Sequence, residues 1–564
     1  MNKFVKLSAI ILFLSLFLAQ SIYAATSDEK QLSEFINQQV KQLAPLEKEL
    51  NITEWNAYIS GSKEDYEKSG KATLSYNSFL NNKENYTKLI DWKKSGKIND
   101  PTLKRQLDIL INLYGPNQIS EELMVKISEK QSELAHKFNN YRGEINGKTV
   151  SERDIYDILA KSTDREERKA AWEAQKGVGP VVSKELIELV KLRNEGARQL
   201  GFKNYYEMQI AFADQDIKEL ENIFSKLVTS TETSFKNYKA LLDDSTRAKF
   251  GISDKSLMPW DYQNPFFQSA DSIFSTDNTG LFKERNLPLI AYNFYDGIGL
   301  GLGNVLKYSD LYEKEGKSQH AFCFDMDRSG DTRILMNLRN DEDSMSTLLH
   351  ESGHAIYNLY IDRSMPWLFR APSHTLTTEC SAMLFERMPK TPQWLVKNLG
   401  AKEEEALKIS AGLKKDQSLG DLIFCRWTVV MFNFEKSMYE NPDQDLNKLW
   451  RDLVLKYQHI TIPEDRNMPD WASKIHLVTS PVYYHNYMLA NLMVSQVLHT
   501  IGTKILKTDN WTVIDFTGNK EAGRFMKEQI FRPGAKYNWN ELIKRATGEY
   551  LNPDYFAKQT AFSD

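Results

Sequence analysis

Two histidines four residues apart dominate the chemistry that this sequence could perform. They lie in the stretch LLHESGHAIYNLY, from Leu348 to Tyr360, with Glu351 directly after the first histidine. On a helix, His350 and His354 fall one turn apart on one face, so both imidazoles can reach one metal ion. Glu351 then points roughly a quarter-turn away, where it can reach a water at the metal without binding the metal itself. Gly353 removes a side chain at a place where the helix could pack against another backbone.

This HExxH pattern indicates a zinc site with the glutamate as general base. The alternative is an ordinary helix that happens to carry two surface histidines. The chain holds 9 histidines in 564 residues, so a chance HExxH is expected on the order of once in a hundred chains of this size. A catalytic zinc needs three protein ligands and one open position. The zinc interpretation therefore depends on a third ligand elsewhere in the chain.

The third ligand is expected on a second helix. Residues 356–360 contain no histidine, and the next candidate is Glu379 in the helix-like run SHTLTTECSAMLFERM, 379 − 354 = 25 residues after His354. That gap is long enough for the first helix to end, turn and send back another. Glu386 lies on the same face as Glu379 and could accept a hydrogen bond from a metal ligand. His374 is a competing ligand, and an exposed helix glutamate is the alternative explanation of Glu379.

A site that hydrolyses an amide also needs a donor for the oxyanion of the tetrahedral intermediate. The stretch SKIHLVTSPVYYHNYMLANLM, residues 473–493, offers such donors far along the chain. His476 comes first, and Tyr484 and Tyr487 follow at a spacing of one helical turn. Neutral histidine and tyrosine are suited to a developing negative charge. A core helix with aromatic packing is the alternative explanation of this stretch.

The elements that must position these residues are mostly helical. Apolar residues recur at helical spacing in long runs such as 164–176, which should stop at the following GVGP, and 216–242. Strand-like sequence is clearest at 320–324 and 333–339, around the turn sequence DRSGD, which predicts a small antiparallel element just before the histidine helix. The glycine-rich DGIGLGLGN at 296–304 lacks the spacing of a phosphate loop and is predicted to be a turn after a helix.

The first 24 residues are predicted to be a secretory signal. Lys3 and Lys6 precede an apolar run at 7–19, and small residues suited to cleavage follow near Ala24. The run is too short for a comfortable membrane span. We therefore expect an exported protein, periplasmic or secreted, without stable membrane insertion after signal removal. A retained N-terminal anchor is the alternative.

The remaining residues, 25–564, are predicted to form a single two-lobed domain, because no internal repeat or linker divides them. The formal net charge is −4 with both signs mixed throughout, so a nucleic-acid partner is not expected. The three cysteines, Cys323, Cys380 and Cys425, argue against a disulfide scaffold, although one pair could form.

Several of these stretches together resemble the angiotensin-converting-enzyme family of zinc peptidyl-dipeptidases and, more distantly, the thimet-oligopeptidase family. They are QHAFCFD, LLHESGHAIY, TTECSAML, LVLKYQHI, SKIHLVTSPVYYHNY and NKEAGRFMKEQIFRPG. The resemblance covers most of the chain after the predicted signal and is strongest from about Ser318 to Gly534. It implies an all-α ellipsoid split by a deep active-site cleft, with zinc at the floor of the cleft and short peptides as substrates.

The resemblance also implies roles for single residues at the metal. His350, His354 and Glu379 match the zinc ligands, and Glu351 matches the general base. The gap from His354 to Glu379 is one residue longer than in the converting enzymes and resembles the oligopeptidases instead.

Further roles are implied for residues that would surround the substrate. His476 and Tyr487 match the donors to the transition state, with their spacing shifted by one residue. Lys474 and Tyr484 match the groups that hold the C-terminal carboxylate of the substrate. His320–Ala321 matches the edge segment that pairs with the substrate backbone.

Three functions remain open from the sequence. The first is a peptidyl-dipeptidase, which Lys474 favours because a cation there can meet a terminal carboxylate two residues beyond the cut. The second is an oligoendopeptidase of the same clan. The third is a catalytically inactive peptide-binding module, which the absence of Glu351, a metal ligand or His476 would favour. All of these residues are present.

Overall fold

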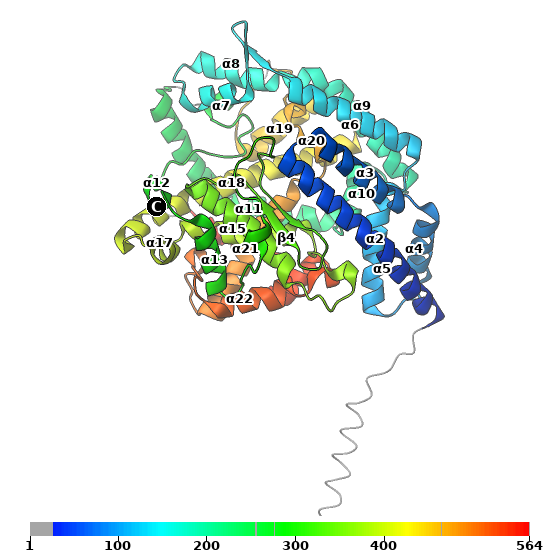
Figure 1. The fold of residues 1–564 in the computed structure, drawn as a ribbon. Coiled ribbons are helices and arrows are strands. Elements are labelled where there is room, and N and C mark those ends of the chain that lie inside the picture. Colours follow the sequence, from blue (N-terminus) through cyan, green and yellow to red (C-terminus); the bar gives the residue numbers. More distant parts are fainter. Residues whose placement is uncertain (1–25, 254–255, 276, 464, 563–564) are drawn as a thin grey trace, which may run out of the picture.

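The fold is mainly helical, as the sequence predicts. The computed structural model describes residues 26–253, 256–275, 277–463 and 465–562 (Figure 1). Helices hold 69% of the described residues, and the strands among them form two antiparallel sheets of two strands each. Among the described helices, none combines the length and apolar content that a membrane crossing requires. The signal predicted for residues 1–24 lies outside the described residues, and the single two-lobed domain stays a prediction.

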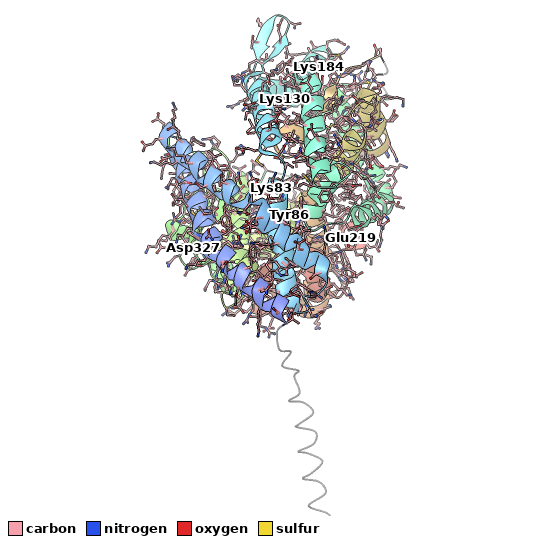
Figure 2. All side chains as sticks on the ribbon, turned by 90° about the vertical axis from the view of Figure 1, so that its right-hand side faces the viewer. Lys83, Tyr86, Lys130, Lys184, Glu219 and Asp327 are labelled. Carbon is pink, nitrogen blue, oxygen red and sulfur yellow. The ribbon has the colours of Figure 1, made fainter. Side chains whose placement is uncertain are left out.

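The N-terminal helices form a layer with its own small core. They are α2 (Ser27–Ser60), α3 (Lys63–Leu80), α4 (Lys83–Ser95) and α5 (Pro101–Tyr114). Thr26 and Glu29 begin α2 with a reciprocal capping box, which satisfies two backbone donors at the start of the helix. Buried residues of α2 and α5, among them Leu43 and Leu110, pack into one apolar cluster. In the turned view, Lys83 and Tyr86 of α4 lie in this layer, and Lys130 and Lys184 lie above it (Figure 2).

Six helices and one two-stranded sheet follow the N-terminal layer along the described chain. They are α6 (Glu121–Asn140), α7 (Glu152–Lys161), α8 (Arg165–Lys176), α9 (Val178–Gln199), α10 (Tyr205–Phe212) and α11 (Ile217–Phe250), with strands β1 (Gly143–Ile145) and β2 (Lys148–Val150) before α7. The predicted stop at GVGP is correct only for Gly177, because helix resumes at Val178. Pro180 is tolerated there since it lies in the first turn of α9, where its missing N–H has no intrahelical partner.

The rest of the chain carries the metal-site motif and most of the core. Its helices are α12 (Thr279–Phe282), α13 (Leu287–Gly297), α14 (Val305–Tyr308), α15 (Glu342–Tyr360), α16 (Thr375–Glu386), α17 (Pro392–Leu399), α18 (Glu403–Glu440), α19 (Leu446–Gln458), α20 (His476–Thr479), α21 (His485–Thr500), α22 (Lys520–Met526), α23 (Trp539–Thr547) and α24 (Asp554–Gln559). Helix α13 ends at Gly297, so the glycine-rich segment is the predicted turn after a helix. One apolar cluster extends from Leu134 to Phe556 and joins these helices to α6, α9, α10 and α11, whereas the buried apolar residues of α7 and α8 belong to a separate small cluster.

Short helical turns fill several connections. The 3₁₀ segments are η1 (Gly115–Asn117), η2 (Pro259–Asp261), η3 (Trp367–Phe369), η4 (Met388–Lys390), η5 (Asp470–Ser473), η7 (Trp511–Val513) and η9 (Gly534–Lys536). Two π-helical segments, η6 (Ile501–Leu506) and η8 (Lys527–Phe531), continue α21 and α22.

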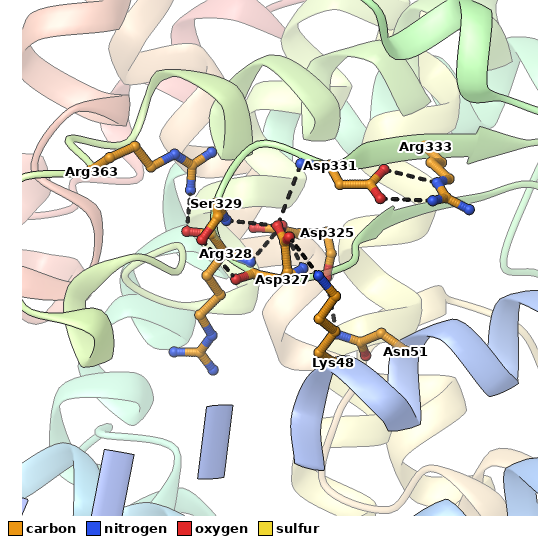
Figure 3. Close-up of polar contacts among 9 residues, drawn as sticks. All are labelled: Lys48, Asn51, Asp325, Asp327, Arg328, Ser329, Asp331, Arg333 and Arg363. Atoms are coloured by element: carbon orange, nitrogen blue, oxygen red, sulfur yellow. Dashed lines mark hydrogen bonds and ion pairs between the residues drawn. The ribbon is translucent and has the colours of Figure 1, made fainter. Parts of the chain in front are cut away.

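A small β-hairpin stands directly before the histidine helix, as predicted. Strands β3 (Phe322–Asp325) and β4 (Thr332–Leu335) pair antiparallel, with Phe322 opposite Leu335. Figure 3 shows how the turn of the hairpin contacts α2 and the segment after α15. The contacts are Lys48 Nζ to Asp327 Oδ2 at 3.2 Å, Asn51 Nδ2 to the Asp325 carbonyl at 3.0 Å and Arg363 Nη1 to the Arg328 carbonyl at 2.8 Å. The hairpin is therefore tied to two separate parts of the fold.

Candidate active site

The three predicted metal ligands converge on one point. Helix α15 begins at an Asp341 cap and carries both histidines on one face, with their ring centroids 5.0 Å apart. Helix α16 returns alongside it and brings Glu379 Oε2 to 3.8 Å from His350 Nε2 and 4.0 Å from His354 Nε2. One ligand atom from each of the three residues lies within 4.8 Å of the other two. Within the described part of the chain, no other histidine, cysteine or carboxylate group gathers in this way.

The outer nitrogens of both imidazoles are already engaged. His350 Nδ1 lies 2.6 Å from Glu386 Oε2, and His354 Nδ1 lies 2.7 Å from Thr378 Oγ1. When Nδ1–H donates to these oxygens, each Nε2 is left with a free lone pair that faces Glu379. Such outer contacts orient the ligands of metal sites and select the tautomer. A donor set of two imidazoles and one carboxylate fits zinc, and Glu386 occupies the supporting position that the sequence suggested.

Burial and neighbouring charges set the protonation of these groups. Burial alone would lower the pKa of His350, but the hydrogen bond with Glu386 and the nearby carboxylates raise it to about 9. Burial lowers the pKa of His354 to about 3, and the charge of His350 adds to this effect. Burial raises the pKa of Glu351 to about 7 and also raises the pKa of Glu379. Neighbouring carboxylates also raise the pKa of both glutamates. A bound cation would favour the charged forms of these carboxylates.

The two ligand-bearing helices touch backbone to backbone. A Cβ atom on Gly353 would lie 2.7 Å from Ala382 Cα and 2.9 Å from the Ser381 carbonyl oxygen. The Ser381 hydroxyl also donates to the Gly353 carbonyl at 2.8 Å. A glycine at this position is thus required for the close approach that places Glu379 opposite the two histidines.

The competing ligand His374 has a different place in the fold. It is the N-cap of α16, and its Nδ1 accepts a hydrogen bond from the Leu376 amide at 3.1 Å. The ring is not part of the metal-ligating group. Capping accounts for this histidine, and the choice of Glu379 over His374 agrees with the geometry.

The metal-ligating group lies on the wall of a cavity of about 830 Å³. Strand β3 forms one wall, and Glu47 of α2 reaches the cavity rim, where it pairs with Arg328 at 2.5 and 2.7 Å. The predicted site residues that line the cavity are Ala321, His350, Glu351, His354, Glu379, Glu386 and Tyr487. The side chain of His320 is exposed and does not line it.

The predicted donor stretch is not one helix. His476 begins the four-residue α20, and Tyr484 is the N-cap of α21, with a turn between them. The His476 and Tyr484 rings lie 4.8 Å apart, and Tyr484 lies 6.2 Å from Tyr487. Through Tyr487 this aromatic row reaches the cavity. Burial lowers the pKa of His476 to about 4, so its imidazole is neutral at pH 7.

Lys474 lies at the far end of the same row, and only 7% of it is exposed. Its Nζ donates to Gln268 Oε1 at 2.8 Å and lies 5.5 Å from the centre of the Tyr484 ring. Burial lowers its pKa to about 8, and Glu152 opposes this shift from a distance. No carboxylate of the described residues forms an ion pair with Lys474. Gln268 was missed from the sequence because a lone glutamine in a loop carries no pattern.

Two further cavity residues were also missed. Tyr483 lines the cavity with its ring 5.2 Å from Tyr487, and the spacing of four residues could have identified it. Cys323 lines the cavity from β3. Cys323, Cys380 and Cys425 are all unpaired, so none of the three cysteines forms a disulfide.

Two peptidase families match different parts of this chain. The family described as "Peptidase family M3" matches residues 296–562, which hold the predicted metal ligands, the donors and Lys474. The family described as "Angiotensin-converting enzyme" matches residues 26–238, from α2 into α11. The two matches are consecutive along the chain.

Several relatives of this chain are named angiotensin-converting enzyme or are described as related to it. An angiotensin-converting enzyme of Theromyzon tessulatum is 22% identical over 81% of this chain and 78% of its own length. That of Rattus norvegicus is also 22% identical, and the match covers 72% of this chain but 33% of the rat protein. An inactive angiotensin-converting enzyme-related protein of Caenorhabditis elegans is 20% identical over 52% of this chain. These matches confirm the resemblance that the motifs indicated: the chain is similar to angiotensin-converting enzymes and to peptidase family M3, and this similarity supports a zinc metallopeptidase.

Proposed function

We propose that this metallopeptidase releases dipeptides from the free C-termini of short peptides. The observation that carries the proposal is Lys474, a buried cation with no carboxylate partner among the described residues. A buried charge is costly unless it is paired and hydrogen-bonded, and Gln268 offers only a neutral oxygen. The terminal carboxylate of a substrate would complete this pair. Tyr484, next to Lys474, would supply a second donor to the same carboxylate.

The chain's own residues supply the remaining parts of the reaction. His350, His354 and Glu379 would hold zinc, which when bound polarises the scissile carbonyl and acidifies water. Glu351 would take the proton of the attacking water and return it to the leaving amine. His476 and Tyr487 would donate hydrogen bonds to the oxygen on which negative charge develops.

The cavity wall would align the substrate. Ala321 directly precedes β3, whose residues line the cavity, so an extended peptide could add its backbone along this edge. His320 is exposed, so a contact from its side chain is not part of the proposal. A terminal carboxylate held at Lys474 would fix how far the peptide enters, and this limit would set the length of the released product.

One observation favours a second function, cleavage within short peptides by an oligoendopeptidase. The half of the chain that holds the predicted metal site matches the family model of peptidase family M3, whereas the family model described as angiotensin-converting enzyme matches residues 26–238. A third possible function is a catalytically inactive peptide-binding module, because one relative is named an inactive angiotensin-converting enzyme-related protein. The presence and convergence of Glu351 and the three predicted metal ligands argue against that third function.

A pair of matched decapeptides separates the first two functions. One has a free C-terminus and the other a C-terminal amide, and mass spectrometry follows the products of each over time. Dipeptides should leave the free-ended peptide stepwise. Equal cleavage of the two peptides at internal bonds by the unmutated enzyme would move the function to an oligoendopeptidase.

The variant Lys474→Met tests the carboxylate contact directly. A charge-assisted hydrogen bond contributes about 1.5–3 kcal/mol, or roughly one to two powers of ten in KM. KM for the free-ended peptide should rise by that factor, and cleavage of the amidated peptide should hardly change. Lys239→Met is the matched control, because Lys239 is equally buried but already paired with Asp243.

The predicted export of the protein stays part of the proposal. Cleavage near Ala24 would leave a mature chain that begins at about residue 25. The N-terminal peptide of the protein purified from its native compartment, identified by mass spectrometry, tests this point. Retention of Lys3 and Lys6 in that protein would indicate an anchor instead.

A further inference from the structure

A strained turn separates the two predicted transition-state donors. Between His476 and Tyr487, the backbone leaves α20 and reaches α21 through Val482, whose φ is +58°. A β-branched residue rarely adopts this left-handed conformation, which costs on the order of 1–3 kcal/mol and persists only where surrounding contacts impose it. Two buried charged residues outside the cavity contact this turn.

The first of these residues is Arg193 on α9, of which 2% is exposed. Its Nη1 donates to the Leu477 carbonyl at 2.9 Å, and its Nη2 donates to the Val478 carbonyl at 2.6 Å. These carbonyls lie in α20, too short a helix to satisfy its own last carbonyls. The Tyr439 hydroxyl at 3.2 Å and Gln131 Oε1 at 2.9 Å hold the same guanidinium in place.

The second residue is Glu435 on α18, of which 3% is exposed. Its Oε1 accepts a hydrogen bond from the Val482 amide at 3.0 Å. This bond falls on the strained residue itself. Arg193 and Glu435 also attract each other electrostatically, although they form no direct ion pair. Arg193 therefore binds the carbonyls of α20 at one end of the turn, and Glu435 binds the amide of Val482 at the other end.

We propose that Arg193 and Glu435 are positioning residues for catalysis, a clamp on the turn at 477–482 that sets His476 relative to Tyr487. The inference rests on the donor roles in the proposed function. Neither residue lines the cavity, so neither can contact substrate there. Their effect would pass through the backbone, because His476 directly precedes the clamped carbonyls and Tyr484 lies two residues after the clamped amide.

The clamp should act on turnover more than on substrate binding. The donors contact an oxygen that gains charge only in the transition state, so their displacement lowers kcat while the ground state is little affected. A misplacement of about 1 Å at a reacting centre can cost on the order of 100-fold in rate. A residue with a purely structural role would lower the melting temperature without this separation of kcat from KM.

Two substitutions at Glu435 provide the central test. In Glu435→Met the acceptor for the Val482 amide is lost, and kcat should fall about 10- to 100-fold with KM changed less than about threefold. In Glu435→Gln the carboxamide oxygen can still accept, so kcat should return to within about twofold of the unmutated enzyme. Burial raises the pKa of Glu435 to about 7, so a neutral acceptor is already populated near neutral pH.

Asp416→Leu is the matched control. Asp416 lies on the same helix, α18, and its carboxylate also accepts backbone amides of a loop, those of Ile273 and Ser275 at 2.8 Å each. That loop does not line the cavity. The control should lose thermal stability like Glu435→Met but keep kcat.

A double variant tests whether the two residues act as one clamp. Arg193→Met alone should lower kcat in the same way. The loss in Arg193→Met/Glu435→Met should be smaller than the product of the two single losses, because both substitutions release the same turn. Independent, multiplicative losses would contradict a shared action.

A readout without turnover keeps the test valid if a variant or the assay fails. Hydrogen exchange followed by mass spectrometry should show faster exchange of the 477–484 amides in Glu435→Met, and unchanged exchange there in Asp416→Leu. If Glu435→Met does not fold, Glu435→Asp withdraws the carboxylate by one methylene and serves in its place. Unchanged exchange and unchanged kcat would overturn the clamp. An unmutated enzyme that cuts only internal bonds would instead overturn dipeptide release, since kcat is measured on whichever bond is cut.

Discussion

Replacing Gly353 by alanine should weaken metal binding, although position 353 is not a metal ligand. The new Cβ would lie 2.7 Å from Ala382 Cα, whereas ordinary contacts begin at 3.4 Å, so the backbones of α15 and α16 must separate by about 3.4 − 2.7 = 0.7 Å. The atoms in the way are backbone atoms of α16, which cannot rotate aside. The whole helix must therefore move, and Glu379 moves with it.

The size of this movement exceeds what a metal site tolerates. Metal–ligand distances hold within about ±0.2 Å, so a displacement of 0.7 Å exceeds that several times. Disturbing the support of metal ligands typically lowers affinity about 10- to 100-fold. Overpacking costs about 1–3 kcal/mol of stability, and alanine recovers about 1 kcal/mol through its helix propensity. The net result should be a less stable protein that binds zinc about 10- to 100-fold more weakly.

Zinc affinity by chelator competition and thermal unfolding of the metal-free protein measure both effects. Gly420→Ala is the control, because Gly420 lies inside α18 and its Cβ would meet nothing within 4 Å. That variant should gain up to about 1 kcal/mol and bind zinc normally. If Gly353→Ala bound zinc as tightly as the unmutated protein, the backbone contact would not be what sets the position of Glu379.

Four further predictions concern the site. Glu379→Ala should lose zinc in metal analysis, because two histidines alone leave a weak site, and full retention would refute the third ligand. Glu351→Gln should keep the zinc but lose about 10²- to 10⁴-fold in kcat, and near-normal turnover would show that another group takes the proton. His374→Ala should retain stoichiometric zinc and lose about 0.5–2 kcal/mol of stability from the lost cap, whereas zinc loss would make it a ligand. The ratio of kcat/KM for free-ended over amidated peptides should fall as pH rises through about 8, because Lys474, whose pKa burial lowers to about 8, loses its charge there. A ratio that stays constant from pH 6 to pH 10 would contradict that role.

The sequence by itself predicted those features whose residues lie close together along the chain. The spacing of His350 and His354 requires that both imidazoles share a helix face. The distance to Glu379 allows a returning helix, and the structure has α16 there. The hairpin before α15 and the turn after α13 were predicted for the same reason, because residues within one turn or one hairpin meet whatever the rest of the chain does.

Only the tertiary structure decided which distant residues meet. Gln268 contacts Lys474 across 206 positions, and no periodicity in the sequence indicates such a pair. His374 was a plausible ligand until the packing of α16 made it a helix cap. The alternative explanation of the donor stretch, a core helix with aromatic packing, fails because the chain turns at Val482 in a conformation that local propensity opposes, and distant Glu435 accepts the hydrogen bond of its amide. Contacts of this kind follow from how whole helices pack around a shared core, and that packing depends on all the helices together rather than on any one segment.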